Sequence, residues 1–137
     1  MKIHDITLSI SPSMPVWPGD PAVKLDLLES MDLGAHANVS ALAISAHTGT
    51  HVDAPHHFLN NGRTGEMLRL DVLCGPALVI RVADTVNAIT AAILEEAGIP
   101  TGTERLIIRT RNSNLWRDDV RQFVEEFVAI PADGADW

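Results

Sequence analysis

Four of the six histidines and one aspartate fall within residues 47–58, which read His-Thr-Gly-Thr-His-Val-Asp-Ala-Pro-His-His-Phe. Imidazole nitrogens and carboxylate oxygens bind zinc or manganese at about 2.0–2.2 Å. A single histidine is more often a surface or core residue than a metal ligand. Here three candidate ligands, His47, His51 and Asp53, occur together. The segment therefore predicts a divalent-metal site.

The spacing of these residues indicates how they would reach a common ion. Gly49 and Pro55 disfavour a helix, so we expect an extended chain, in which alternate side chains share a face. The chemically active residues of this face are all odd-numbered: His47, His51, Asp53 and His57. Gly49 leaves that face open between the first two histidines. The pattern differs from the His-Glu-x-x-His helix of zincins, and the presence of one cysteine excludes a cysteine-rich zinc site.

The composition limits the possible partners and the cellular compartment. A chain of 137 residues suits one domain, residues 1–137, with a single core. The net charge of −8 disfavours nucleic acids and anionic membranes as partners. The single cysteine, Cys74, excludes an internal disulfide and fits a reducing cytoplasm. We expect no secretory signal, because the first residues lack a long apolar run, and no membrane span.

The hydrophobic pattern predicts a mixed α/β fold. Alternating or continuous apolar runs predict strands at residues 3–10, 23–29, 38–46, 75–82, 104–110 and 128–130. We expect one helical turn at 67–73, a helix at 91–97 between an N-cap at Thr90 and a stop at Gly98, and a weak helix at 117–126. Four prolines and Gly19 predict a shaped loop at 11–21. The strand, helix and strand over 75–110 predict a parallel βαβ unit.

The last residues, 131–137, look like the first turn of a helix with Pro131 at its start. A chain that stops at a large apolar residue such as Trp137 has nothing after it to complete the packing. We therefore expect a C-terminally incomplete domain, although a solvent-exposed tail would look the same. Exposed strand edges in such a chain would favour a homo-oligomer.

Two segments resemble the signatures of a known family, the cyclase-like metal-dependent hydrolases, which includes bacterial kynurenine formamidase. The histidine segment 47–58 resembles the family's main motif. Residues 14–21, which read Met-Pro-Val-Trp-Pro-Gly-Asp-Pro, resemble its second motif, and the Trp of this motif is close to the formamidase form. The segments Gly-Pro-Ala-Leu-Val at 75–79 and Leu-Ile-Ile-Arg-Thr at 106–110 also fit, so the resemblance extends along the chain.

The resemblance implies a swivelling β/β/α fold, in which a mixed sheet surrounds a barrel-like core with helices outside. It implies that His47, His51 and Asp53 are metal ligands, that His57 is the catalytic histidine and that Trp17 is a wall of the substrate pocket. Zinc is the expected metal and manganese the alternative. The family continues beyond the position of Trp137, and that part carries a further His and Glu of a second metal site.

The implied function is hydrolysis of an N-formyl aryl amide such as N-formylkynurenine, a step of tryptophan catabolism, by metal-activated water. Three alternatives remain open for the residues: His57 could orient a ligand, Trp17 could pack in the core, and Asp20 could only cap its turn. Two alternatives remain open for the protein. It could hydrolyse another cyclic or aryl amide, or it could be a non-catalytic, metal-binding oligomer without the second-metal ligands.

Overall fold

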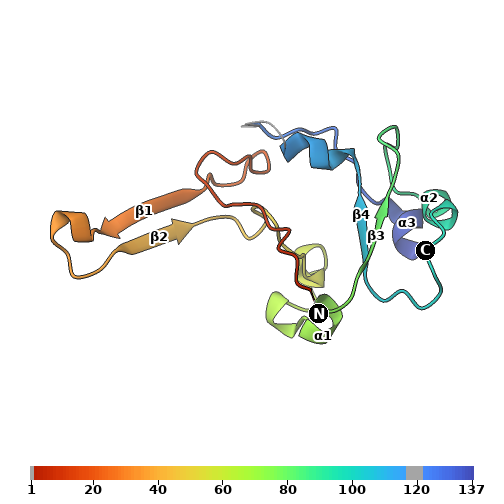
Figure 1. Cartoon of the computed structure of the whole chain (residues 1–137), viewed down its shortest axis with the longest axis horizontal. Helices are drawn as coiled ribbons and strands as arrows, with labels where there is room; N and C mark the ends of the chain where they lie inside the picture. Colours follow the sequence, from red (N-terminus) through yellow and green to blue (C-terminus); the bar gives the residue numbers. More distant parts are fainter. Residues whose placement is uncertain (1, 117–121) are drawn as a thin grey trace. The chain divides into compact units, whose positions relative to one another are not determined.

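The computed structural model describes residues 2–116 and 122–137 and contains short helices and two small sheets (Figure 1). Four strands and three α-helices carry labels: β1 (Lys24–Glu29), β2 (Val39–Ala43), α1 (Leu70–Leu73), β3 (Leu78–Arg81), α2 (Ala91–Glu96), β4 (Leu106–Arg109) and α3 (Ala132–Asp136). Short 3-10 turns lie at Met31–Leu33, Pro55–His57, Gly65–Met67 and Arg111–Trp116. The predicted mixed α/β class is confirmed.

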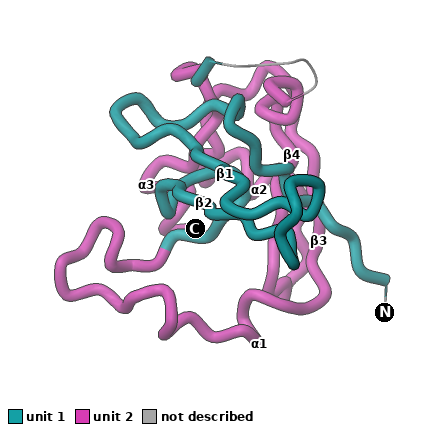
Figure 2. Tube along the Cα trace, turned by 90° about the vertical axis from the view of Figure 1, so that its left-hand side faces the viewer, with its two compact units in different colours: residues 1–53, 120–123 teal, residues 54–119, 124–137 magenta. Residues whose placement is uncertain are grey.

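The chain forms two compact units (Figure 2). The first comprises residues 1–53 with 120–123, and the second comprises residues 54–119 with 124–137. The boundary between Asp53 and Ala54 falls inside the histidine segment. The assignment of residues 1–137 to one domain stays a prediction.

The first unit contains the antiparallel hairpin of β1 and β2, which pairs Leu25 with Leu42 and Leu27 with Ser40. Its turn includes Gly34, whose φ of 90° is in the left-handed region that favours glycine. Both predicted strands form, but the second is shorter than 38–46. Small apolar residues in this stretch are typical of a buried strand, yet four of the five residues of β2 are exposed. A two-stranded sheet by itself buries few of its side chains, which explains the difference.

The strand predicted at residues 3–10 does not form. None of the described residues in that range has strand pairing, although the sequence alternates in the expected way. Instead, the Leu8 N–H donates to the Thr50 hydroxyl at 3.0 Å. A strand requires a partner ladder, and alternation alone does not provide one. The segment is held beside the histidine loop by this side-chain hydrogen bond.

The second unit contains the predicted βαβ arrangement. β3 pairs with β4 in parallel, in the register Leu78 with Leu106 and Ile80 with Ile108, and α2 lies between them in sequence. The Thr90 hydroxyl accepts a hydrogen bond from the Ile93 N–H at 3.4 Å, so the predicted N-cap is confirmed. The core residues are buried and come from the ends of β3, from α2 and from the segments beside them: Val82, Ile89, Leu94 and Val128.

Two polar side chains connect the end of the chain to this core. The Asn112 amide donates to the Val128 carbonyl and accepts from its N–H, both at 2.8 Å. The Asp133 carboxylate of α3 accepts from the Ala91 N–H at the start of α2 at 3.1 Å. The strand predicted at 128–130 is only an isolated bridge between Ala88 and Ala129, while the helical turn predicted after Pro131 is confirmed as α3.

The remaining predictions have mixed outcomes. The loop at 11–21 and the helical turn within 67–73 are confirmed. The helix predicted at 117–126 lies partly outside the described residues, and residues 122–126 are not helical. Among the described residues, no helix is long and apolar enough to cross a membrane.

Candidate metal centre

The histidine segment is a turn followed by a short helix, and the expectation of an extended chain is wrong. Residues 46–50 form turns and bends, and Pro55–His57 forms a 3-10 helix. Gly49 has a φ of 66°, a left-handed conformation that residues with a Cβ rarely adopt. The turn at Gly49, rather than strand alternation, brings the neighbouring histidines to the same side.

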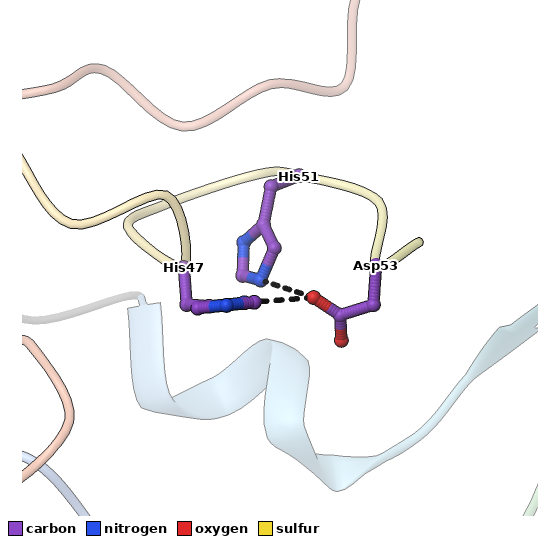
Figure 3. A group of neighbouring side chains, drawn as sticks. All are labelled: His47, His51 and Asp53. Carbon is purple, nitrogen blue, oxygen red and sulfur yellow. Dashed lines mark hydrogen bonds and ion pairs between the residues drawn. The ribbon is translucent and has the colours of Figure 1, made fainter. Parts of the chain in front are cut away.

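The three predicted ligands nevertheless converge (Figure 3). One ligand atom from each of His47, His51 and Asp53 lies within 4.8 Å of the others. The His47 Nδ1 is 2.8 Å from the Asp53 Oδ1, and the His51 Nε2 is 3.4 Å from the same oxygen. The two imidazole rings lie 5.4 Å apart between centroids at an interplanar angle of 74°. The structure therefore brings the three residues together, and their role as metal ligands stays a prediction.

The donor set fits a divalent cation. Ligands about 2.0–2.2 Å from a tetrahedral ion lie about 3.3–3.6 Å from one another, which matches the separation of His51 and Asp53. The closer pair of His47 and Asp53 is at hydrogen-bond distance and would open slightly around an ion. Two imidazoles and one carboxylate suit zinc and also manganese. Three side chains would then bind the ion and leave a position for water or substrate.

A backbone contact orients the second histidine. The His51 Nδ1 lies 2.8 Å from the Gly49 carbonyl oxygen, a separation at which the ring nitrogen donates. This hydrogen bond selects the tautomer with the proton on Nδ1 and leaves the lone pair of Nε2 directed toward Asp53. The turn at Gly49 thus supplies both the approach of the histidines and the orientation of one ring.

The loop at 11–21 packs against this turn. A Cβ at Gly49 would lie 3.2 Å from the Met14 ε-methyl and 3.8 Å from Ile10 Cγ1. The Leu8–Thr50 hydrogen bond connects the preceding segment to the same turn. The absence of a side chain at Gly49 therefore has two consequences. It permits the left-handed backbone conformation, and it lets Met14 approach closely.

Thr48 lies between the first histidine and the glycine and is 5% exposed. Its hydroxyl has no hydrogen-bond partner among the residues that the structure describes. An unpaired buried hydroxyl costs roughly 1–3 kcal/mol, so such a group is a marker for a water, an ion or a further protein segment. Thr48 is next to His47 in the chain, so this unpaired hydroxyl lies beside a candidate metal ligand.

His57 lies in the second unit, at the end of the 3-10 helix Pro55–His57. Its N–H donates to the Ala54 carbonyl at 2.9 Å, and its ring lies 4.1 Å from that of Phe58. The helix breaks the odd-number pattern that placed His57 on the face of the ligands. Its catalytic role stays a prediction, because it rests on the family motif and not on this geometry.

Trp17 lies in the first unit and is 53% exposed, so the described structure does not bury it in a core, and its role as a pocket wall stays a prediction. The Asp20 N–H donates to the Trp17 carbonyl at 2.9 Å, which closes the turn that presents the indole. The Trp17 ring meets the Phe123 ring edge to face, with centroids 4.9 Å apart. No sequence pattern indicated this pair, because Phe123 is distant in the chain and belongs to no motif.

The chain is similar along its length to known proteins. The family model described as "Putative cyclase" matches residues 4–137. The chain is 38% identical over 143 residues to Cyclase-like protein 1 of Arabidopsis thaliana, covering 99% of this chain and 56% of that protein. It is 38% identical over 145 residues to Cyclase-like protein 3 of Oryza sativa subsp. japonica, with 99% and 52% covered. The chain thus spans about half the length of the curated relatives it matches.

Two solved structures share the fold. One is described as a potential metal-dependent hydrolase with cyclase activity, with a TM-score of 0.74, 28% identity, and 98% of this chain and 60% of that chain covered. The other is described as a predicted metal-dependent hydrolase from Bacillus stearothermophilus, with a TM-score of 0.72, 29% identity, and 98% and 62% covered. The expected cyclase-like fold is confirmed.

Proposed function

The chain belongs to the cyclase family, and on that premise we propose that it acts as a metal-dependent amidohydrolase on the N-formyl amide of an aromatic amine, with N-formylkynurenine as the substrate type. The observation that carries the proposal is the convergence of His47, His51 and Asp53 on one point. Metal-dependent hydrolase is also the description of both similar structures.

A divalent ion bound at this point would supply a Lewis acid and a water of lowered pKa. His47 and His51 would hold it through neutral nitrogens, and Asp53 would add one negative charge. The Gly49 carbonyl keeps the His51 ring turned toward the site. We propose zinc as the native ion, with manganese as the alternative, because this donor set accepts both.

We propose that His57 is the general acid and base of the reaction. It would accept the proton released during attack on the formyl carbon and pass it to the departing aniline nitrogen. Such a group typically contributes about 10²–10⁴-fold to the rate. Trp17 would form an apolar wall, and its exposed indole offers a flat surface to an aromatic ring.

Hydrolysis of N-formylkynurenine by the metal-loaded protein tests the proposal, with formanilide as the simplest analogue. The protein is depleted with a chelator and reloaded with zinc or manganese, and the released amine is followed by absorbance. Turnover that disappears with the chelator and returns with metal supports the proposal. A reloaded protein with one ion per chain and no turnover on either amide contradicts it. Replacement of His57 by Ala should lower kcat about 10²–10⁴-fold while the metal content stays constant.

Two alternatives are distinguished by the same preparation. If the chain has the same chemistry but another substrate, it would hydrolyse a different aryl or cyclic amide, such as an isatin-like ring, and leave formanilide intact. A non-catalytic metal-binding oligomer would bind a single ion weakly and hydrolyse none of these amides. Metal stoichiometry by mass spectrometry and a panel of amides therefore separate the three functions.

We also propose that the chain self-associates and works in the cytoplasm. The register of β1 and β2 places Leu25, Leu27 and Leu42 on one face, and all three are at least half exposed. An isolated two-stranded sheet is marginal in water, so this face favours a partner surface such as a second copy. Sedimentation analysis tests this: Leu27→Glu should shift an oligomer toward monomer, and a monomeric parent protein contradicts the proposal. The single cysteine supports a reducing compartment, which fractionation would test.

A further inference from the structure

Phe123 lies next to the aromatic side chain that the proposed function assigns to substrate. It contacts Trp17 edge to face at 4.9 Å with an interplanar angle of 67°. Edge-to-face contact is a preferred geometry for aromatic pairs, because the positive ring edge meets the negative ring face. The segment that carries Phe123 groups with residues 1–53 and not with the second unit that precedes and follows it in sequence. The contact therefore belongs to the unit that contains the metal ligands.

Met14 connects the loop at 11–21, which carries Trp17, to the turn at residues 46–50, which carries His47. The Met14 ε-methyl lies against the open side of Gly49, between the two histidine ligands in sequence. Trp17 follows Met14 by three positions, and three residues of chain span at most about 11 Å. That reach is comparable to the length of an aryl amide with a short side chain. A substrate whose amide lies at the metal ligands can therefore place its ring near Trp17.

The Trp17 side chain needs a neighbour to hold one orientation. It is 53% exposed, and an exposed side chain on a loop can sample several staggered rotamers. Phe123 is only partly exposed and its ring meets the indole edge to face, which restricts those rotamers while about half of Trp17 stays exposed. A Trp17 side chain that already has one orientation loses less conformational entropy when a substrate ring binds against it.

We propose that Phe123 is a specificity-determining positioning residue, which holds the Trp17 indole so that the site prefers aromatic over aliphatic N-formyl amides. The proposal rests on the proposed function for the identity of the amide. Phe123 acts through Trp17 and does not take part in the chemistry at the metal.

The test compares Phe123→Leu and Phe123→Tyr with the unchanged chain, with formanilide as the aryl probe and N-butylformamide as the alkyl probe. An aromatic pair contributes a factor of about 2–12 in an equilibrium constant. In Phe123→Leu we expect the ratio of kcat/KM for aryl over alkyl amide to fall about 2- to 12-fold, mainly through KM. Phe123→Tyr keeps the aromatic ring, so the ratio should stay close to that of the unchanged chain. Trp137→Leu, which removes an exposed aromatic side chain of the second unit, is the control and should leave the ratio unchanged.

Binding measurements keep this test separate from the proposed function. Formanilide and N-butylformamide are titrated calorimetrically into the zinc-loaded protein, so that the affinity ratio is measured without turnover. If the parent protein binds formanilide more tightly but hydrolyses neither amide, the proposed function fails and the affinity ratio in Phe123→Leu still decides the role of Phe123. An unchanged ratio in Phe123→Leu overturns the inference, as does equal binding or no binding of both probes by the parent protein. An equal fall in Trp137→Leu also overturns it, because the loss of any aromatic side chain would then have the same effect.

Discussion

Replacement of Gly49 by Ala should weaken metal binding more than it weakens the rest of the fold. Gly49 has a φ of 66°, and a residue with a Cβ loses roughly 1–2 kcal/mol in adopting that conformation. The added methyl would also lie 3.2 Å from the Met14 ε-methyl, a contact that a flexible methionine can relieve by a small shift. The backbone conformation is therefore the main cost.

This cost should appear in the affinity for zinc. Without metal, the backbone of the Gly49→Ala variant can relax to a negative φ and move His47 and His51 apart. Metal binding must then restore the strained turn, and a cost of about 1–2 kcal/mol corresponds to roughly a 5- to 30-fold loss of affinity. Zinc affinity is measured by competition with a chromophoric chelator, and the free energy of unfolding by denaturant titration.

Gly34→Ala is the matched control. Gly34 has a φ of 90° in the turn of the β1–β2 hairpin, and a Cβ there would meet no atom within 4 Å. Its replacement should introduce comparable backbone strain without a change in zinc affinity. Equal affinity in the parent protein and in Gly49→Ala would refute the reasoning that this turn presents the histidines. An equal loss in both variants would show a general effect of strain instead.

Three further outcomes are expected. His51→Ala removes the ligand whose Nε2 faces Asp53 and should abolish stoichiometric zinc binding, while His36→Ala, a histidine outside the cluster, should not; zinc retained in His51→Ala would exclude that ligand. Thr48→Val replaces an unpaired buried hydroxyl by a methyl and should leave the free energy of unfolding unchanged or raise it by up to about 1 kcal/mol. A decrease of more than about 1 kcal/mol in denaturant titration would show that the hydroxyl has a partner. Ile89→Ala truncates a side chain that is 2% exposed and should lower the free energy of unfolding by about 2–5 kcal/mol, whereas a loss below about 1 kcal/mol would place this side chain outside the core.

The local elements that depend on neighbouring residues were predictable. Thr90 and Gly98 bracket α2, and prolines exclude regular structure from the loop at 11–21, because capping and ring constraints act within a few residues. The parallel pair β3–β4 followed from the order of the elements and the usual handedness of their connection.

Predictions that needed a distant partner were less reliable. Residues 3–10 have the alternation of a strand and no ladder, since no other segment pairs with them among the described residues. The strand near residue 128 is reduced to one bridge at Ala129. Side-chain pattern describes which faces are apolar, whereas pairing requires a second backbone at the right distance.

The candidate metal centre shows the same division. The sequence alone predicted a divalent-metal site. His47, His51 and Asp53 have side chains that bind such ions, and they lie within seven residues of one another. The tertiary structure decided how they converge, through a left-handed turn at Gly49 supported by Met14, and it brought Phe123 to Trp17. The chemistry of a ligand belongs to its side chain and can be read from the sequence. A contact between residues far apart in the chain depends on the path of the folded backbone, which no local pattern specifies.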